Sequence, residues 1–172
     1  MNIIDLINKK RLKKALTNEE IKFIIERFMS GKIKDYQMSS LLMAICINGM
    51  NEKETIALTK AMLDNSEKLD LSSIEEIKVD THSTGGVGDK TTLVIAPLVA
   101  ACGVVVPKMS GRGLGHTGGT IDKLESIEGF NPNLSDEEFI NQLKEIRVAI
   151  TTTSSNLVPA DKKIYALRDV TG

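Results

Sequence analysis

Residues 77–106 read IKVDTHSTGGVGDKTTLVIAPLVAACGVVV and decide the fold class of the chain. A short β-like run at Ile77–Val79 precedes a glycine-rich loop, which leads to an apolar, helix-like stretch at Thr91–Ala101 and a second β-like run at Val104–Val106. This order of strand, loop, helix and strand predicts an α/β lobe with a mixed or parallel sheet. Ligands of such sheets bind where the strands end.

The sequence after this stretch continues the same alternation. Ser135 and Glu138 form a capping box ahead of a helix, Val148–Thr151 is a third candidate strand, and Pro159 suits the first turn of a last helix. About three strands cannot make a well-covered parallel sheet, because both faces and both edges need cover. We therefore expect an incomplete chain, or one that a partner completes.

The sequence before this stretch predicts helices only. Thr17 and Glu20 form a capping box, Asp35 is placed to cap a second helix, and Asn51 starts a third. No cluster of catalytic side chains accompanies them. We interpret residues 1–66 as an all-helical lobe for packing and association.

Composition excludes several classes of protein. Apolar residues make up 41% and charged residues 26%, as in ordinary globular domains. The 22 basic and 23 acidic side chains leave a formal charge of −1, which gives no electrostatic reason to bind nucleic acid or a membrane. Without a visible export signal, and with Cys46 and Cys102 interpreted as reduced, buried thiols, we expect a cytoplasmic protein.

Glycines are concentrated in the region where chemistry is expected. Nine of the 13 glycines, and the only two histidines, His82 and His116, lie between Thr81 and Thr120. Glycines let backbone N–H groups converge on an anion, and neighbouring hydroxyls add donors. Two such loops, at 81–92 and 108–120, each follow a β-like run. They favour phosphate binding over turns alone.

Two other phosphate motifs do not fit. A Walker A loop needs adjacent Gly and Lys, whereas Asp89 separates Gly88 from Lys90. A G-x-G-x-x-G pattern begins at Gly113, seven residues past Val106, whereas the dinucleotide fingerprint directly follows a strand. We therefore interpret that match as accidental.

Three stretches resemble the pyrimidine-nucleoside and thymidine phosphorylases: VDTHSTGGVGDKTT, KMSGRGLGHTGGTIDKLESI and PADKKIYALRDVT. With the helical lobe, the resemblance covers essentially the whole chain. It implies a homodimer of subunits more than twice as long as this chain. The implied division is a helical dimerisation lobe at 1–66, a partial α/β phosphate-binding lobe at 67–156, and a helix returning to the helical lobe at 157–172.

The resemblance also implies an activity, that of a pentosyltransferase. Phosphate attacks C1′ of a pyrimidine nucleoside, such as uridine or thymidine, and releases the base and a pentose 1-phosphate, with no organic cofactor. His82 and Arg168 are the implied catalytic contacts to the pyrimidine, where donors stabilise charge on the departing base. The implied substrate-binding residues around phosphate are Thr81, Ser83, Thr92, Lys108, Met109, Ser110 and Thr120.

Some positions depart from the family pattern. Thr81 replaces a usual lysine, which predicts weaker phosphate binding. Gly88 and Lys90 occupy potassium-site positions, and the Lys90 ammonium is expected to replace that cation. Thr152 and Thr153 replace a usual Gly-Gln pair. The family's further base-contacting Ser and Lys do not occur within these 172 residues.

Other interpretations remain open at this point. The chain could belong to a related nucleotide phosphorylase or phosphoribosyltransferase, or be an inactive fragment that only dimerises or binds anions. His116 is interpreted as a structural hydrogen bonder, and Glu125 as a solvated charge. The sequence does not decide between uridine and thymidine.

Overall fold

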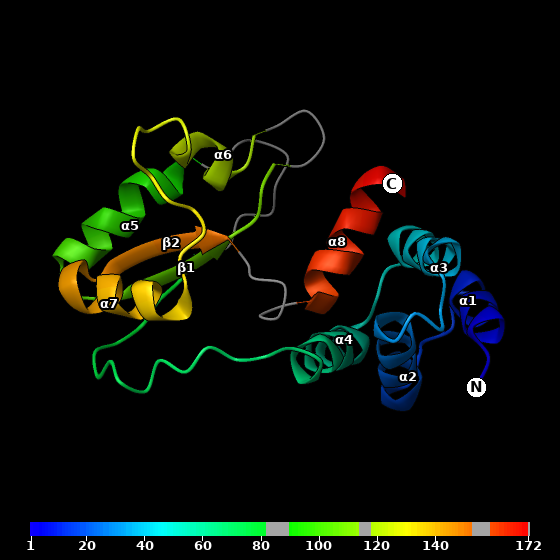
Figure 1. Cartoon of the computed structure of the whole chain (residues 1–172). Helices are drawn as coiled ribbons and strands as arrows, with labels where there is room; N and C mark the ends of the chain where they lie inside the picture. Colours follow the sequence, from blue (N-terminus) through cyan, green and yellow to red (C-terminus); the bar gives the residue numbers. More distant parts are fainter. Residues whose placement is uncertain (82–89, 114–117, 153–158, 172) are drawn as a thin grey trace. The chain divides into compact units, whose positions relative to one another are not determined.

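The computed structural model describes residues 1–81, 90–113, 118–152 and 159–171. These residues form two compact units (Figure 1). The first contains Met1–Lys68 together with the C-terminal helix, and the second extends from Leu69 through the last strand. The predicted fold class, a helical lobe followed by part of an α/β lobe, is confirmed.

The first unit is a bundle of helices. Its helices are α1 (Ile3–Arg11), α2 (Asn18–Met29), α3 (Asp35–Asn48), α4 (Glu52–Asp64) and α8 (Pro159–Thr171). Its most deeply buried side chains include Ile25, Phe28, Met38 and Leu41, and Ala160 of α8 joins the same core. The apolar faces of these helices therefore pack against one another.

A lysine fixes the end of α2 against α8. The Lys163 ammonium donates to the carbonyl of Phe28 at 2.9 Å and lies 4.1 Å from the centre of the Phe28 ring. A cation at the carboxyl end of a helix also complements the helix dipole. Helix α8 is therefore held to the bundle by its apolar side chains and by the charged Lys163.

Local capping sets most helix ends in this unit. The capping boxes of Thr17 and Asn51 are present as predicted. The prediction that Asp35 caps α3 is wrong, because Lys34 is the capping position and its N–H donates to Gln37 at 3.0 Å. Asp35 is instead the first residue of the helix, where a carboxylate still complements the dipole.

The second unit contains a two-stranded parallel sheet. Strand β1 (Val106–Ser110) pairs with β2 (Val148–Thr152) in a register that places Val106 beside Val148 and Ser110 beside Thr152. The surrounding helices are α5 (Thr91–Ala101), α6 (Thr120–Leu124) and α7 (Asp136–Ile146).

Two strand boundaries differ from the prediction. The Ile77–Val79 run contributes a single parallel bridge, Lys78 to Val105, in place of a strand. The run at Val104–Val106 becomes a strand only at Val106, because the N–H of Val104 still bonds the carbonyl of Val99 at the end of α5. The strand then continues to Ser110, beyond the apolar run that predicted it.

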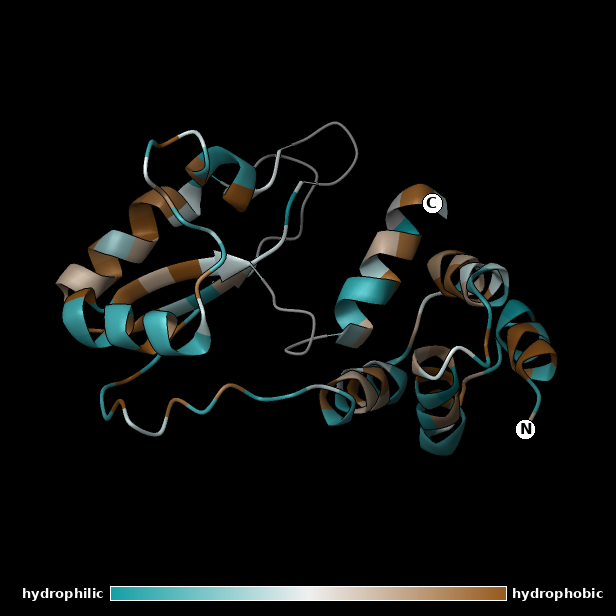
Figure 2. Cartoon of the chain, viewed as in Figure 1, coloured by the Kyte–Doolittle hydropathy of each residue, from teal (hydrophilic) through white to brown (hydrophobic). Residues whose placement is uncertain are grey.

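One helix covers each face of the sheet (Figure 1). Ala96 and Ala100 of α5 pack with Val106, whereas Phe139 and Leu143 of α7 pack with Ala149 on the other side. Figure 2 shows α5 hydrophobic along most of its length, while α7 alternates between hydrophobic and hydrophilic. The exposed side chains of α5 include Val94, which is 66% exposed.

Two further sequence-based expectations meet the structure here. Cys46 and Cys102 are both exposed, so the expectation of buried thiols is wrong. Cys46 lies in the last turn of α3, and Cys102 directly follows α5. In the described part of the chain, no helix has the length and apolar character needed to cross a membrane.

Candidate functional site

The segments that carry the expected chemistry leave the sheet at one edge. Strand β1 ends at Ser110, where the second glycine loop begins. Lys78 bridges Val105 in parallel, so Asp80 and Thr81 follow the same direction and lead into the first glycine loop. Both loops therefore start at the carboxyl end of the sheet, where ligands of α/β proteins bind.

Lys108 connects β1 to the start of the first loop. The residue is only 4% exposed, and its ammonium donates to Asp80 Oδ1 at 3.1 Å, to Thr81 Oγ1 at 3.3 Å and to the carbonyl of Thr81. An ammonium has three hydrogens, and these are three acceptors. The Lys108 ammonium therefore holds Asp80 and Thr81 against β1.

Asp122 connects the two ends of the second loop. Its Oδ2 accepts a hydrogen bond from the N–H of Gly113 at 2.6 Å and another from the N–H of Gly119 at 2.8 Å. These backbone donors lower the pKa of Asp122, Gly113 first and then Gly119, and Arg112 acts in the same direction. The carboxylate is therefore ionised at neutral pH.

Arg112 braces the same carboxylate. Its Nη1 lies 3.3 Å from Asp122 Oδ1, and its guanidinium makes a two-pronged contact to Glu125 at 2.5 and 2.8 Å. The hydrogen bonds from Arg112 lower the pKa of Glu125, and the partnership raises the pKa of Arg112. The interpretation of Glu125 as a simply solvated charge is wrong, because this fork-shaped pairing holds it.

Gly119 allows the two ends of the loop to touch. A Cβ built on Gly119 would lie 2.6 Å from the carbonyl carbon of Arg112 and 2.6 Å from the nitrogen of Gly113. It would also lie 2.9 Å from the carbonyl oxygen of Gly111. Only glycine permits this approach of backbone to backbone.

The other expected phosphate residues lie on regular elements of the same unit. Thr92 is buried in the first turn of α5, and Thr120 is the buried first residue of α6. Met109 and Ser110 are the last two residues of β1 and pair with Thr151 and Thr152. This register places Met109 and Ser110 at the end of the sheet where the second loop begins.

Of the other expected residues, one belongs to the helical unit and three lie outside the described residues. Arg168 is an exposed residue of α8, in the helical unit, with its guanidinium carbon 4.9 Å from the centre of the Tyr165 ring. His82, Ser83 and Gly88 lie outside the described residues.

Two further departures from the family pattern have visible positions. Lys90 is exposed and directly precedes α5. Thr152, at the end of β2, donates through its hydroxyl to Asn133 Oδ1 at 3.1 Å, whereas Thr153 lies outside the described residues. A cationic side chain at position 90 does not fit the donor set of a potassium site, because an ammonium has no lone pair to offer.

Sequence reasoning missed Asp122 and Arg112. A partial signal for Asp122 was present, because it stands three residues after Gly119 at the position from which acidic side chains reach back to a helix start. The contacts of Arg112 with Glu125 and of Asp122 with Gly113 carry no such local signal. They depend on how the loop folds back.

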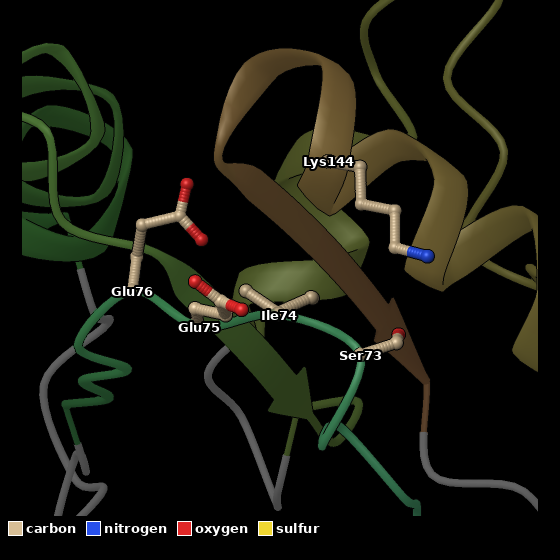
Figure 3. A pocket seen from close by; sticks show the side chains of 5 residues that line it. All are labelled: Ser73, Ile74, Glu75, Glu76 and Lys144. Atoms are coloured by element: carbon tan, nitrogen blue, oxygen red, sulfur yellow. The ribbon is translucent and has the colours of Figure 1, made fainter.

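A separate surface depression of about 640 Å³ is lined by Ser73, Ile74, Glu75, Glu76 and Lys144 (Figure 3). Figure 3 shows Glu75 and Glu76 on neighbouring positions of one segment and Lys144 projecting from α7. None of these five residues belongs to the loops described above.

Comparisons with known proteins agree on one family. A model described as the helical bundle domain of a glycosyl transferase family matches residues 4–66, and one described as its a/b domain matches residues 75–172. The chain belongs to this glycosyl transferase family. Within it, the chain groups with the pyrimidine-nucleoside phosphorylases.

The individual relatives support this grouping. The chain is 61% identical over 172 residues to a pyrimidine-nucleoside phosphorylase of Staphylococcus epidermidis, and 62% identical over 171 residues to one of Geobacillus stearothermophilus. The match covers 100% and 99% of this chain, respectively. The chain spans about 40% of the length of these relatives.

A solved structure confirms the fold. Anthranilate phosphoribosyltransferase from Thermus thermophilus superposes with a TM-score of 0.73 at 22% identity, over 96% of this chain and 50% of that one. This likeness concerns the fold alone.

Proposed function

We propose that this chain provides the phosphate-binding part of a pyrimidine-nucleoside phosphorylase. In the proposed reaction, an oxygen of orthophosphate forms a bond to C1′ of a pyrimidine nucleoside while the bond from C1′ to the base nitrogen breaks. The base leaves with that electron pair and takes up a proton, and the sugar leaves as pentose 1-phosphate. The observation that carries the proposal is the identity of about 60% over the whole chain.

The geometry of the second unit supports a phosphate site. Ser110 and Thr120 stand at the two ends of a loop whose ends are joined by Asp122 and by the close approach of Gly119. Hydroxyls and backbone amides in a glycine-rich turn are typical donors to phosphate. We assign the anion to these residues, together with Thr92, Met109 and the expected Ser83.

We keep Lys108 among the proposed phosphate contacts, and the structure adds a second role for it. Because its hydrogens are directed at Asp80 and Thr81, it holds the start of the first loop and adds positive potential nearby. Thr81 occupies the position where the family usually has a lysine, and its oxygens accept hydrogen bonds from the Lys108 ammonium. We expect phosphate binding to be weaker than with a lysine at position 81.

The remaining assignments follow the family. We propose His82 and Arg168 as the contacts that stabilise negative charge on the departing base. We propose that no organic cofactor takes part and that Lys90 replaces potassium. A cytoplasmic location, to be checked by cell fractionation, completes the proposal.

A homodimer through the helical unit is also proposed. On α3, the side chains of Tyr36, Met43 and Ile47 are 72%, 37% and 73% exposed. Their spacing of seven and four residues places them in one stripe along the helix. An exposed apolar stripe of this kind suits a second copy of the chain better than water does.

The activity test compares base release with and without orthophosphate. Uridine, thymidine and deoxyuridine are each incubated with the chain, and free base and pentose 1-phosphate are separated by chromatography. The matched variants are Ser110→Ala, at the proposed site, and Ser30→Ala, at the end of α2. Phosphate-dependent release that falls in Ser110→Ala but not in Ser30→Ala supports the proposal.

Other outcomes select the alternatives. Calorimetric heat on adding orthophosphate without turnover would favour an anion-binding module. Release of pyrophosphate from phosphoribosyl pyrophosphate would favour a phosphoribosyltransferase. Neither heat nor turnover, with only a dimer in solution, would favour a dimerisation module.

A further inference from the structure

The second glycine loop is closed by a carboxylate whose contacts exceed those of a helix cap. Asp122 in α6 accepts from the N–H of Gly119, as a capping side chain does. It also accepts from the N–H of Gly113, nine residues earlier, at 2.6 Å. Capping explains the first bond only, and α6 has just five residues to cap.

The same carboxylate is oriented from its other side. Arg112 reaches Asp122 Oδ1 at 3.3 Å while its guanidinium makes two contacts to Glu125, the residue directly after α6. Planar, two-pronged pairing of this kind restricts the rotation of both partners. Arg112, Asp122 and Glu125 thus form a clasp, a name we use for these three residues.

The clasp brings together the neighbours of the two proposed phosphate hydroxyls. Gly111 directly follows Ser110, and Gly119 directly precedes Thr120. A Cβ on Gly119 would lie 2.9 Å from the carbonyl oxygen of Gly111, so these backbones are in direct contact. Any loosening at Asp122 therefore changes the separation of Ser110 and Thr120.

We propose that Asp122, held by Arg112 and Glu125, is a positioning residue that sets the distance between Ser110 and Thr120 for binding inorganic phosphate. This inference rests on the proposed function, because it presumes that the loop binds phosphate. Asp122 itself does not contact the anion, because its negatively charged carboxylate would repel the negatively charged phosphate.

The test measures orthophosphate affinity by calorimetry in Asp122→Ala, Asp122→Asn and the control Glu128→Ala. Glu128 is an exposed carboxylate just beyond α6, so its removal changes the net charge by the same amount. We expect Asp122→Ala to weaken binding about tenfold or more, which corresponds to at least ~1.4 kcal/mol. Asp122→Asn keeps an acceptor oxygen and should lose about threefold, and Glu128→Ala less than about twofold.

Amide hydrogen exchange provides a second, ligand-free measurement. The amides of Gly113 and Gly119 should be protected in the wild type and should exchange faster in Asp122→Ala. If turnover is present, KM for phosphate should rise more than kcat falls, because a positioning role acts on binding. Should Asp122→Ala fail to fold, Asp122→Asn supplies the comparison.

The results separate this inference from the proposed function. If Asp122→Ala binds orthophosphate as tightly as the wild type does, the positioning role is overturned and the proposed phosphorolysis still stands. If Asp122→Ala does not fold, the same comparison is made with Asp122→Asn. Fast exchange at Gly113 and Gly119 in the wild type also overturns it. A wild type that binds no orthophosphate overturns both.

Discussion

The ammonium of Lys10 lies 2.7 Å from a carboxylate oxygen of Glu54, and both side chains are almost fully buried. The same oxygen accepts from the N–H of Leu16 at 2.9 Å, and the other oxygen accepts from the N–H of Asn51 at 2.9 Å. One carboxylate therefore ties α1, the segment leading into α2, and the start of α4. Buried charges are tolerated only with this degree of pairing.

Replacing Glu54 with alanine should destabilise the helical unit by about 3–5 kcal/mol, because it leaves the Lys10 ammonium buried without its partner. Urea unfolding followed by far-ultraviolet circular dichroism measures the change. Glu26→Ala is the matched control, since Glu26 forms an exposed pair with Lys22 at 3.8 Å. That variant should lose less than about 0.5 kcal/mol. Equal losses in the two variants would contradict the assignment.

Stability should also fall at acidic pH. Burial raises the pKa of Glu54, but hydrogen bonds from Leu16, Lys10 and Asn51 outweigh it and leave the pKa below its ordinary value of 4.5. A lowered folded-state pKa contributes stability that is present above pH 4.5 and is lost as the pH falls through the folded value. Glu20, bound by Lys9, contributes with the same sign.

The measurement is the free energy of unfolding between pH 7 and acidic pH in the wild type and in Glu54→Gln. The variant should show a shallower decline below pH 4.5, because the amide does not titrate. Identical slopes would show that Glu54 has no part in the acid sensitivity.

The sequence predicts features that are set by neighbours in the chain. The capping boxes at Thr17 and Ser135 depend on residues three positions apart, and both occur in the structure. The end of β1 at Ser110 could not be predicted, because pairing with Thr152 extends the strand through the polar Lys108 and Ser110. Strand limits depend on a partner that is distant in sequence.

In the candidate site too, local features could be predicted from the sequence, whereas contacts between distant residues could not. Glycines and hydroxyls identified the loops, because backbone freedom and donor chemistry are properties of single residues. The contact of Arg112 with Glu125 joins residues 13 apart, and that of Lys108 with Asp80 joins residues 28 apart. Such pairs form only when the chain folds, so the contacts of Lys108 with Asp80 and Thr81 could not be predicted from the sequence.

Gly119→Ala should destabilise the α/β unit by about 1–3 kcal/mol, because the added methyl would meet backbone atoms at 2.6 Å that cannot yield as a side chain would. Gly111→Ala is the control, since a Cβ there meets nothing within 4 Å. Thermal unfolding of both variants compares them directly. A Gly119→Ala protein as stable as Gly111→Ala would show that the loop ends do not touch in solution.

Ile47→Glu should convert a dimer of the chain to a monomer, because it places a charge in the exposed stripe of α3. Sedimentation equilibrium over a range of concentrations gives the mass. Ile56→Glu on α4 is the matched control, with an isoleucine that is 60% exposed outside that stripe. A dimer lost equally in both variants, or kept in both, would place the contact elsewhere.

Lys90→Thr should make phosphate binding sensitive to potassium, whereas the wild type should bind equally in potassium and sodium chloride. The Lys90 ammonium supplies a fixed positive charge at the start of α5. Without it, a bound monovalent cation can supply the missing positive charge. Calorimetric titration at equal ionic strength in the two salts separates the specific ion from general screening. Lys144→Thr, on α7 of the same unit, removes an equal charge and should not create a preference for potassium. If the wild type already needs potassium, the ammonium does not replace the cation.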